Sequence, residues 1–495
     1  MSDGTDPGWR FQEGFEYEFS TLDPMSAHVD PPAIAAYETL VVKGADGLAK
    51  AGLAESLEPD PAGTTWTLRL RDGLRFHSGA ACDARAVVRS LDAVRWQLGD
   101  GRQLWYWDAV DQVRALDGRT LQFTLHHPSV RFPSLLWGTH TAIHNEELRL
   151  AEPDRFGTEI VDGTGPYRLG SWSSEKVVLQ RWDEYRDHHF DGPTTIEWRS
   201  IRDGGQRVAE LEAGQLDCIH SPPPAQVQRL AADPRYKSYI HPQAASMYLS
   251  LDWHHEIGFA DHRVREAISL AIDRDAIVDV VFGGLASAMY GPLPPGHDFY
   301  DSSIDAHHVR ELGAAQVLLD GAGWVVGSDG VRKRDGLRLE FRCVVQDDEV
   351  FRAVAGVVRE QLRQAGVALK LDFVRPFADF YTACRDGAPA AISKWLWQDP
   401  VDALIGFAST ATAPFPNWSN ASSARLDRAF DEWTHATTNP VMAEAATEVQ
   451  RAFVDDLPYI PLLTPHDVWV WRQEVAGFEP SARTLYPTYL GIRQT

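Results

Sequence analysis

Strand-like and helix-like segments alternate along the whole of this 495-residue chain, and this alternation constrains the fold more than any other feature. Residues 64–76, TTWTLRLRDGLRF, alternate apolar and polar side chains, and Asp72-Gly73 then predicts a hairpin turn. Residues 83–98, DARAVVRSLDAVRWQL, carry apolar residues at helical spacing, with Asp83 placed to cap the helix. Such alternation is typical of an α/β protein.

The same alternation continues to the C-terminal part of the chain. A strand is predicted in RTLQFTLHH, residues 119–127, and a long helical region in residues 261–284, ending at Gly283-Gly284. A shorter helix is predicted in residues 311–324, and a helix, a stop at Gly366 and a strand in residues 350–374. No low-complexity linker separates these segments, so we expect domains that exchange strands.

Charge and motifs exclude several classes of function. The net charge is −23, from 70 acidic and 47 basic residues, which argues against nucleic acid and against an anionic membrane surface as partners. No apolar run is long enough to span a membrane. Phosphate-loop, zinc-protease and nucleophile-elbow motifs are absent, and the side chains of adjacent histidines diverge. We therefore expect no catalytic residues, no metal site and no cofactor.

None of the four cysteines belongs to a CxxC motif. We expect mostly free, buried thiols, and a bridge between Cys343 and Cys384 stays open as an alternative.

The stretch ISKWLWQDPVDALIGF, residues 392–407, places Trp395 and Trp397 on one face of a predicted strand that stops at Asp399-Pro400. The chain has 17 Trp against 14 Tyr, and indole rings suit stacking on sugars, peptide side chains or heterocycles. Two interpretations remain open for this pair: part of a hydrophobic core, or the wall of a binding site.

Several phrases resemble one known family in the same order along nearly the whole chain. They are WTLRLRDGLRFHSGAACDARAVVRSLDAV, GTGPYRLGSW, FADHRVREAISLAIDRDAIV, ELGAAQVLLDGAGW and, after the Asp-Pro pair, NWSNASSARLDRAF. The chain resembles family 5 extracellular solute-binding proteins, the peptide-, nickel- and oligosaccharide-binding components of ABC importers.

The resemblance implies an α/β, two-lobed periplasmic-binding-protein fold of type II, in the large version with an extra subdomain in the first lobe. The lobe I core would comprise residues 1–30, 156–246 and 472–495, and the extra subdomain residues 31–155. Lobe II would comprise residues 247–471. The two lobes would close on a ligand about a hinge of crossing strands.

The implied function is binding without catalysis. A monomer would capture a small solute, oligopeptide-like or oligosaccharide-like, in the interlobe cleft and deliver it to the ABC permease subunits. It would act in the periplasm or as a cell-surface lipoprotein. MSDGTDPGWRF carries no signal peptide, so the signal segment would be absent from this chain. Carboxylates are plentiful, so a carbohydrate-active hydrolase remains the alternative.

The resemblance also implies which residues line the cleft. The first lobe would contribute His28 and Asp30 and aromatic side chains of the extra subdomain, and the remaining candidates lie near the hinge or in the second lobe. The aromatic side chains of the extra subdomain are Trp105, Tyr106 and Trp107. The remaining candidates are Tyr248, Trp253, Lys394, Trp395 and Trp397.

Peptide-binding relatives carry an acid before the Asp-Pro-like pair that receives the peptide's α-amino group. Residues 394–398 hold no acid. We therefore expect a ring-bearing, neutral or anionic solute slightly ahead of an ordinary peptide, with a metal chelate third. Four side chains of the long helical region are expected to fix it to its lobe: Arg263, Arg265, Asp273 and Arg274. Gly163, Gly165 and Pro166 are expected to shape a turn.

Overall fold

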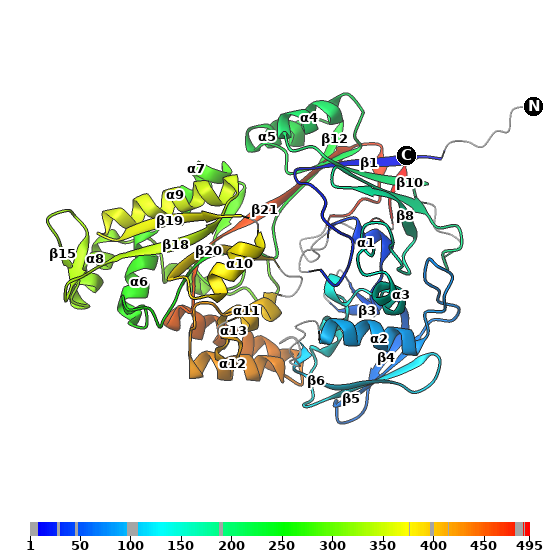
Figure 1. The fold of residues 1–495 in the computed structure, drawn as a ribbon, viewed down its shortest axis with the longest axis horizontal. Helices are drawn as coiled ribbons and strands as arrows, with labels where there is room; N and C mark the ends of the chain where they lie inside the picture. Colours follow the sequence, from blue (N-terminus) through cyan, green and yellow to red (C-terminus); the bar gives the residue numbers. More distant parts are fainter. Residues whose placement is uncertain are drawn as a thin grey trace, which may run out of the picture. The chain divides into compact units, whose positions relative to one another are not determined.

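The computed structural model describes residues 8–26, 30–44, 48–96, 107–187, 192–375, 377–396, 400–413, 415–480, 489 and 491–495. The chain divides into two compact units (Figure 1). Unit 1 comprises Met1–His241 and Asp467–Thr495, and unit 2 comprises Pro242–His466. The finer division of unit 1 into a core and an extra subdomain at residues 31–155 stays a prediction.

Unit 1 is a mixed α/β structure. Its helices are α1 (Ala33–Ala36), α2 (Ala84–Arg95), α3 (Glu146–Ala151), α4 (Gly204–Glu212) and α5 (Pro224–Ala232). Its strands are β1 (Arg10–Phe15), β2 (Val41–Lys43), β3 (Ala49–Ala51), β4 (Ala54–Pro59), β5 (Thr65–Leu70), β6 (Val110–Ala115), β7 (Thr120–Leu125), β8 (Tyr167–Ser173), β9 (Lys176–Arg181), β10 (Thr195–Ser200), β11 (Cys218–His220), β12 (Tyr236–Pro242), β22 (Val475–Ala476) and β23 (Arg493–Gln494).

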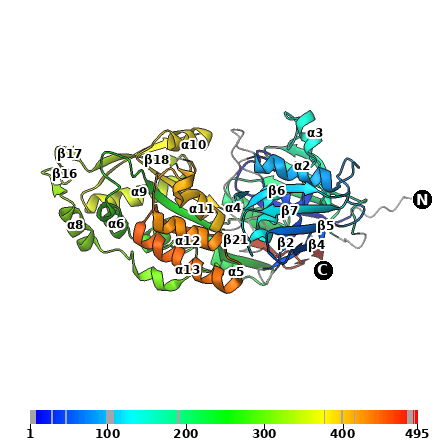
Figure 2. The ribbon, with the colours of Figure 1, turned by 90° about the horizontal axis from the view of Figure 1, so that it is seen from below.

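The main sheet of unit 1 has the strand order β21-β11-β1-β10-β9-β8, where β21 is Ile460–Arg472. Strand β1 runs parallel to both β10 and β11, so the start of the chain lies in the middle of this sheet. A second, four-stranded sheet has the order β4-β5-β7-β6. Helix α2 lies along this second sheet (Figure 2) and buries Val87, Leu91 and Val94.

Unit 2 is also mixed α/β. Its strands are β13 (Ala245–Leu251), β14 (Ala286–Ala288), β15 (Val325–Val326), β16 (Arg332–Arg334), β17 (Leu337–Arg338), β18 (Glu340–Gln346), β19 (Ala368–Val374), β20 (Ala390–Leu396) and the first part of β21. Its helices are α6 (His262–Ala271), α7 (Arg274–Phe282), α8 (Leu312–Gly321), α9 (Glu349–Gln364), α10 (Phe377–Arg385), α11 (Pro400–Ala408), α12 (Ala424–Thr434) and α13 (Asn439–Asp456).

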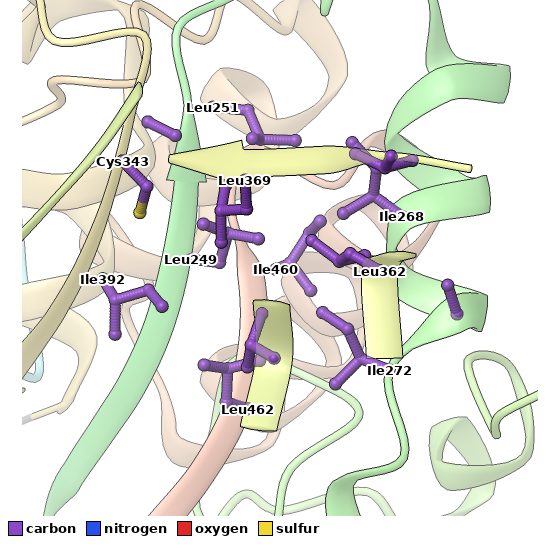
Figure 3. Close-up of a cluster of buried hydrophobic side chains, with 14 of the residues drawn as sticks. Leu249, Leu251, Ile268, Ile272, Cys343, Leu362, Leu369, Ile392, Ile460 and Leu462 are labelled. Carbon is purple, nitrogen blue, oxygen red and sulfur yellow. The ribbon is translucent and has the colours of Figure 1, made fainter. Parts of the chain in front are cut away.

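The sheet of unit 2 runs β19-β18-β20-β13-β21 and is buried on both faces. Along β13, Leu249 and Leu251 enter a cluster with helices α6 to α9, in which Ile268 and Leu362 lie close to the sheet (Figure 3). Tyr248, on the opposite face of β13, enters a second cluster with helices α10 to α13. This alternation follows from the period-two geometry of a strand.

The predicted helix that starts at Asp83 is confirmed, and the hairpin predicted before it, at Asp72-Gly73, is wrong. Asp83 accepts the N–H of Ala86 at 2.9 Å and caps α2. Strand β5 pairs with β4 and β7, and no strand follows Asp72-Gly73 within residues 74–76. Gly73 turns with a φ of +68°, but Phe76 is buried without joining a ladder, because β5 pairs instead with β4, which directly precedes it, and with the distant β7.

The long helical region predicted at residues 261–284 is two helices. Asp273 accepts the N–H of Ala276 and starts α7, and Gly283 ends it in the left-handed conformation. Arg274 is 1% exposed and donates to the carbonyls of Pro461, at 2.8 Å, and His308, at 3.0 Å. Its guanidinium therefore fixes the start of α7 to β21, as expected.

Gly163 and Gly165 permit a close approach of two backbones. A Cβ on Gly163 would lie 2.2 Å from the carbonyl oxygen of Ala36, and one on Gly165 would lie 2.7 Å from that of Ala35. Only glycine fits against α1 at these two positions, which explains the turn predicted there.

The expectation of free, buried thiols is confirmed: Cys82, Cys218, Cys343 and Cys384 are buried and unbridged. Over the described part of the chain, no helix combines the length and apolarity needed to cross a membrane. In the same residues, no three His, Cys, Asp or Glu side chains gather into a group that could hold a metal ion.

We predict that Arg274→Met lowers the free energy of unfolding by about 3 kcal/mol, because buried carbonyls of α6, β21 and the loop at His308 lose their donors. Arg263→Met is the matched control, since Arg263 is exposed and its bonds to Asp261 and to the carbonyl of Gly321 lie at the surface, and it should cost less than about 1 kcal/mol. Urea unfolding measures both, and equal losses would contradict the assignment.

Candidate ligand-binding site

Strand β20 carries two of the predicted ligand-facing residues. It pairs with β13 in an antiparallel register that sets Trp395 opposite Ser246 and Lys394 opposite Met247. Trp395 is 2% exposed, and its indole Nε1 donates to the hydroxyl of Tyr459 at 3.2 Å. Lys394 projects from the other face of the strand and is half-buried. Trp397, the second tryptophan of the pair, lies outside the described residues.

Trp395 and Tyr248 belong to one aromatic cluster in unit 2. The ring of Tyr248 lies 4.6 Å from that of Tyr459 and 5.9 Å from that of Phe407, measured between centroids. Trp418 contacts Phe407 at 5.6 Å. Burial raises the pKa of Tyr248 well above its usual value, so the phenol stays neutral. The cluster thus brings together two predicted site residues, and their contact with a ligand stays a prediction.

Tyr459 and Trp418 complete this cluster and were missed from the sequence. Each is an isolated aromatic residue, Tyr459 just before β21 and Trp418 in the loop before α12. The apolar run YIPLL at residues 459–463 indicates a buried strand. It does not indicate which residues the ring of Tyr459 contacts.

Trp253 lies directly after β13 and covers a buried cation. Its ring centroid is 3.8 Å from the guanidinium carbon of Arg265. Arg265 donates to the carbonyls of Phe259 and Asp456, at 2.7 and 2.6 Å. Burial lowers the pKa of Arg265 to about 10, so the charge is kept at neutral pH. One face of Trp253 is therefore used inside unit 2.

Asp30 closes the loop before α1. Its carboxylate accepts the backbone N–H groups of Ser20 at 2.5 Å and Thr21 at 2.6 Å, and its side chain is buried. Trp107 is completely buried in unit 1. The other first-lobe candidates, His28, Trp105 and Tyr106, lie outside the described residues.

Six of the ten predicted site residues lie within the described ranges. Asp30, Trp107, Tyr248, Trp253 and Trp395 are each packed or hydrogen-bonded within a single unit. Lys394 is half-buried on β20.

Residues 49–414 match the family described as bacterial extracellular solute-binding proteins, family 5 Middle. The match covers more than half of the chain, and the protein belongs to this family. The α/β, two-lobed periplasmic-binding-protein fold expected from the sequence is confirmed by solved structures of the family.

The glutathione-binding protein GsiB of Escherichia coli (strain K12) is 28% identical over 305 residues, which span 59% of this chain and 59% of that relative. The structure of DppA from Helicobacter pylori in complex with the peptide STSA has a TM-score of 0.82 at 21% identity, covering 98% of both chains. NikZ from Campylobacter jejuni in complex with Ni(L-His) has a TM-score of 0.79 at 19% identity, covering 97% of both. Neither the family nor these relatives favour the hydrolase alternative.

We predict that Trp395→Ala lowers the free energy of unfolding by about 3–5 kcal/mol, because a buried indole and its hydrogen bond to Tyr459 are lost. Trp96→Ala, at a 44% exposed position, should cost less than about 1 kcal/mol. Thermal or urea unfolding gives both values. A Trp395→Ala protein of unchanged stability that no longer binds ligand would instead assign this ring to the cleft.

Proposed function

We propose that this protein captures a small peptide-like solute outside the cytoplasm and delivers it to the permease of an ABC importer. The observation that carries the proposal is the family match, because the family consists of extracellular solute-binding proteins. The relatives narrow the ligand class: glutathione, the peptide STSA and Ni(L-His) all contain amino-acid units. The oligosaccharide option has no support in these three relatives.

The ligand would lie in a cleft that closes around it, as the resemblance implies. Closure buries most of a ligand and requires a partner for each polar group removed from water. We infer that Lys394 on β20 is one candidate for such a contact, because its side chain is charged and half-buried. The other predicted residues stay candidates as well. The proposal also includes that the protein acts as a monomer and that a lipid anchor holds it at the cell surface.

The charge of the second-lobe segment favours an anionic group on the ligand. Residues 393–398 are Ser, Lys, Trp, Leu, Trp and Gln, so Lys394 is the ionised side chain of this stretch. A peptide or glutathione offers at least one carboxylate to such a cation, and a hydrogen bond between two charged groups is stronger than a neutral one.

We expect a mixed pool of di- to pentapeptides, or glutathione, to raise the melting temperature, because a ligand that binds only the folded state stabilises it by mass action. Oligosaccharides and a nickel–histidine complex serve as parallel ligand classes. A shift with oligosaccharides and none with peptides or glutathione would contradict the proposed ligand class.

We predict that Lys394→Met weakens binding of glutathione or an active peptide by about 10- to 100-fold, the equivalent of roughly 1.5–3 kcal/mol, with little change in melting temperature. Lys333→Met, at an exposed position on β16 of the same unit, is the matched control and should bind normally. Isothermal titration calorimetry measures both affinities. Equal affinity of Lys394→Met and wild type would remove Lys394 from the site.

A further inference from the structure

A single carboxylate lies at the centre of unit 1. Glu13, on β1, is completely buried, and its Oε2 accepts the indole N–H of Trp198 at 3.0 Å and the hydroxyl of Tyr489 at 2.8 Å. Its Oε1 accepts the indole N–H of Trp469 at 3.1 Å and lies 3.7 Å from the Sγ of Cys218. Four segments of the unit therefore meet at one side chain: β10, β11, β21 and the C-terminal segment.

All four of these donors are neutral, which sets Glu13 apart from another buried glutamate of the same unit. Glu146 accepts the Nε and Nη2 groups of Arg149 at 2.6 and 2.8 Å and also contacts the Nε2 of His144 at 2.9 Å. Burial opposes ionisation of Glu146, but the contacts with His144 and Arg149 outweigh it and lower the pKa to about 2. A buried carboxylate without a bonded cation has no such compensation.

The charged groups that face Glu13 from the neighbouring strands are already engaged. On β11, His220 contacts the carboxylate of Glu16 at 2.9 Å and, through Nε2, that of Asp467 on β21 at 3.8 Å. Burial opposes the charge of His220, but Glu16 and Asp467 outweigh it and raise the pKa of this imidazole to about 10. This cation lowers the pKa of Glu13 only through space.

The remaining titratable neighbours are a neutral thiol, a neutral phenol and an arginine that is bonded elsewhere. Burial raises the pKa of the Cys218 thiol and of the Tyr489 phenol well above their usual values. Arg207 on α4 donates to the carbonyls of Ile201, His220 and Ser221 and so is used elsewhere. Within the described residues, no cation is hydrogen-bonded to Glu13.

We infer that Glu13 is a proton-binding site of unit 1, which takes up a proton from solvent between neutral and mildly acid pH and thereby changes the bonds that hold Trp469 and Tyr489. Burial raises the pKa of Glu13 from 4.5 to about 7, against the opposing effect of its donors, in agreement with this geometry.

The chemistry of the four donors defines what changes on protonation. An indole N–H cannot accept a hydrogen bond, so the new carboxyl proton cannot be directed to Trp198 or Trp469. The hydroxyl of Tyr489 can turn from donor to acceptor. Protonation also converts the charge-assisted bond from Trp469, on the strand that continues from unit 2, into a weaker neutral one.

The sign of the pH dependence follows from the raised pKa. The contribution of Glu13 to stability is fully present below its ordinary pKa of 4.5 and is lost as the pH rises through about 7. Compared with a Glu13→Gln protein, the wild type should therefore lose stability as the pH rises, with about one additional proton bound in its folded state near pH 6.

The test is urea unfolding of the wild type, Glu13→Gln and Glu146→Gln from about pH 5 to about pH 8, with the difference in bound protons taken from the slope. Glu146→Gln is the matched control and should run parallel to the wild type, because Glu146 stays ionised throughout this range. The inference is overturned if Glu13→Gln also runs parallel, or if both variants flatten the curve equally.

A second measurement keeps the inference testable if Glu13→Gln does not fold. Infrared spectroscopy of the wild type follows the C=O band of a protonated, buried carboxyl group during a pH titration. The band should grow as the pH falls through about 7, and Trp469→Phe, which removes a donor from the carboxylate, should move the midpoint upward. A wild-type band that is constant over this range overturns the inference.

Discussion

Strand β21 is the element on which both units depend. Its 13 residues, Ile460–Arg472, pair with β13 in unit 2 through residues 460–463 and with β11 in unit 1 through residues 469–471. Its side chains enter the core of unit 2 at Leu462 and the core of unit 1 at Trp469. Because one continuous strand serves both sheets, no linker composition marks the passage at His466–Asp467.

Buried charged side chains have two opposite kinds of surroundings in these units. Arg207 in unit 1, and Arg265 and Arg274 in unit 2, are buried and donate to main-chain carbonyls. Glu13 is the reverse case, a buried anion surrounded by neutral donors. The first arrangement keeps its charge and fixes loops, and the second leaves a group that can take up a proton.

Local features were predictable, and distant partners were not. The cap at Asp83 and the stop at Gly366 follow from neighbouring residues, and both occur in the structure. The hairpin at Asp72-Gly73 failed because β5 pairs with β4, the strand before it, and with β7 at Thr120–Leu125, a distant partner that the local sequence does not identify. The order of the motifs along the chain identified the family, because the motifs lie in both units.

The site was less predictable than the fold for a physical reason. Period-two alternation gives the same pattern for a ring that packs in a core and one that lines a cleft, so the sequence left Trp395 open. The ring is buried and bonded to Tyr459 within unit 2, and its contact with a ligand stays a prediction. His28, Trp105, Tyr106 and Trp397 stay predictions, because they lie outside the described residues.

Capture of a peptide-like solute is tested most directly by native mass spectrometry of the purified protein, before and after incubation with a pool of di- to pentapeptides and glutathione. The proposed function predicts an added mass in this range that is released on denaturation. A spectrum that shows the free protein alone, both as purified and after incubation, would contradict it.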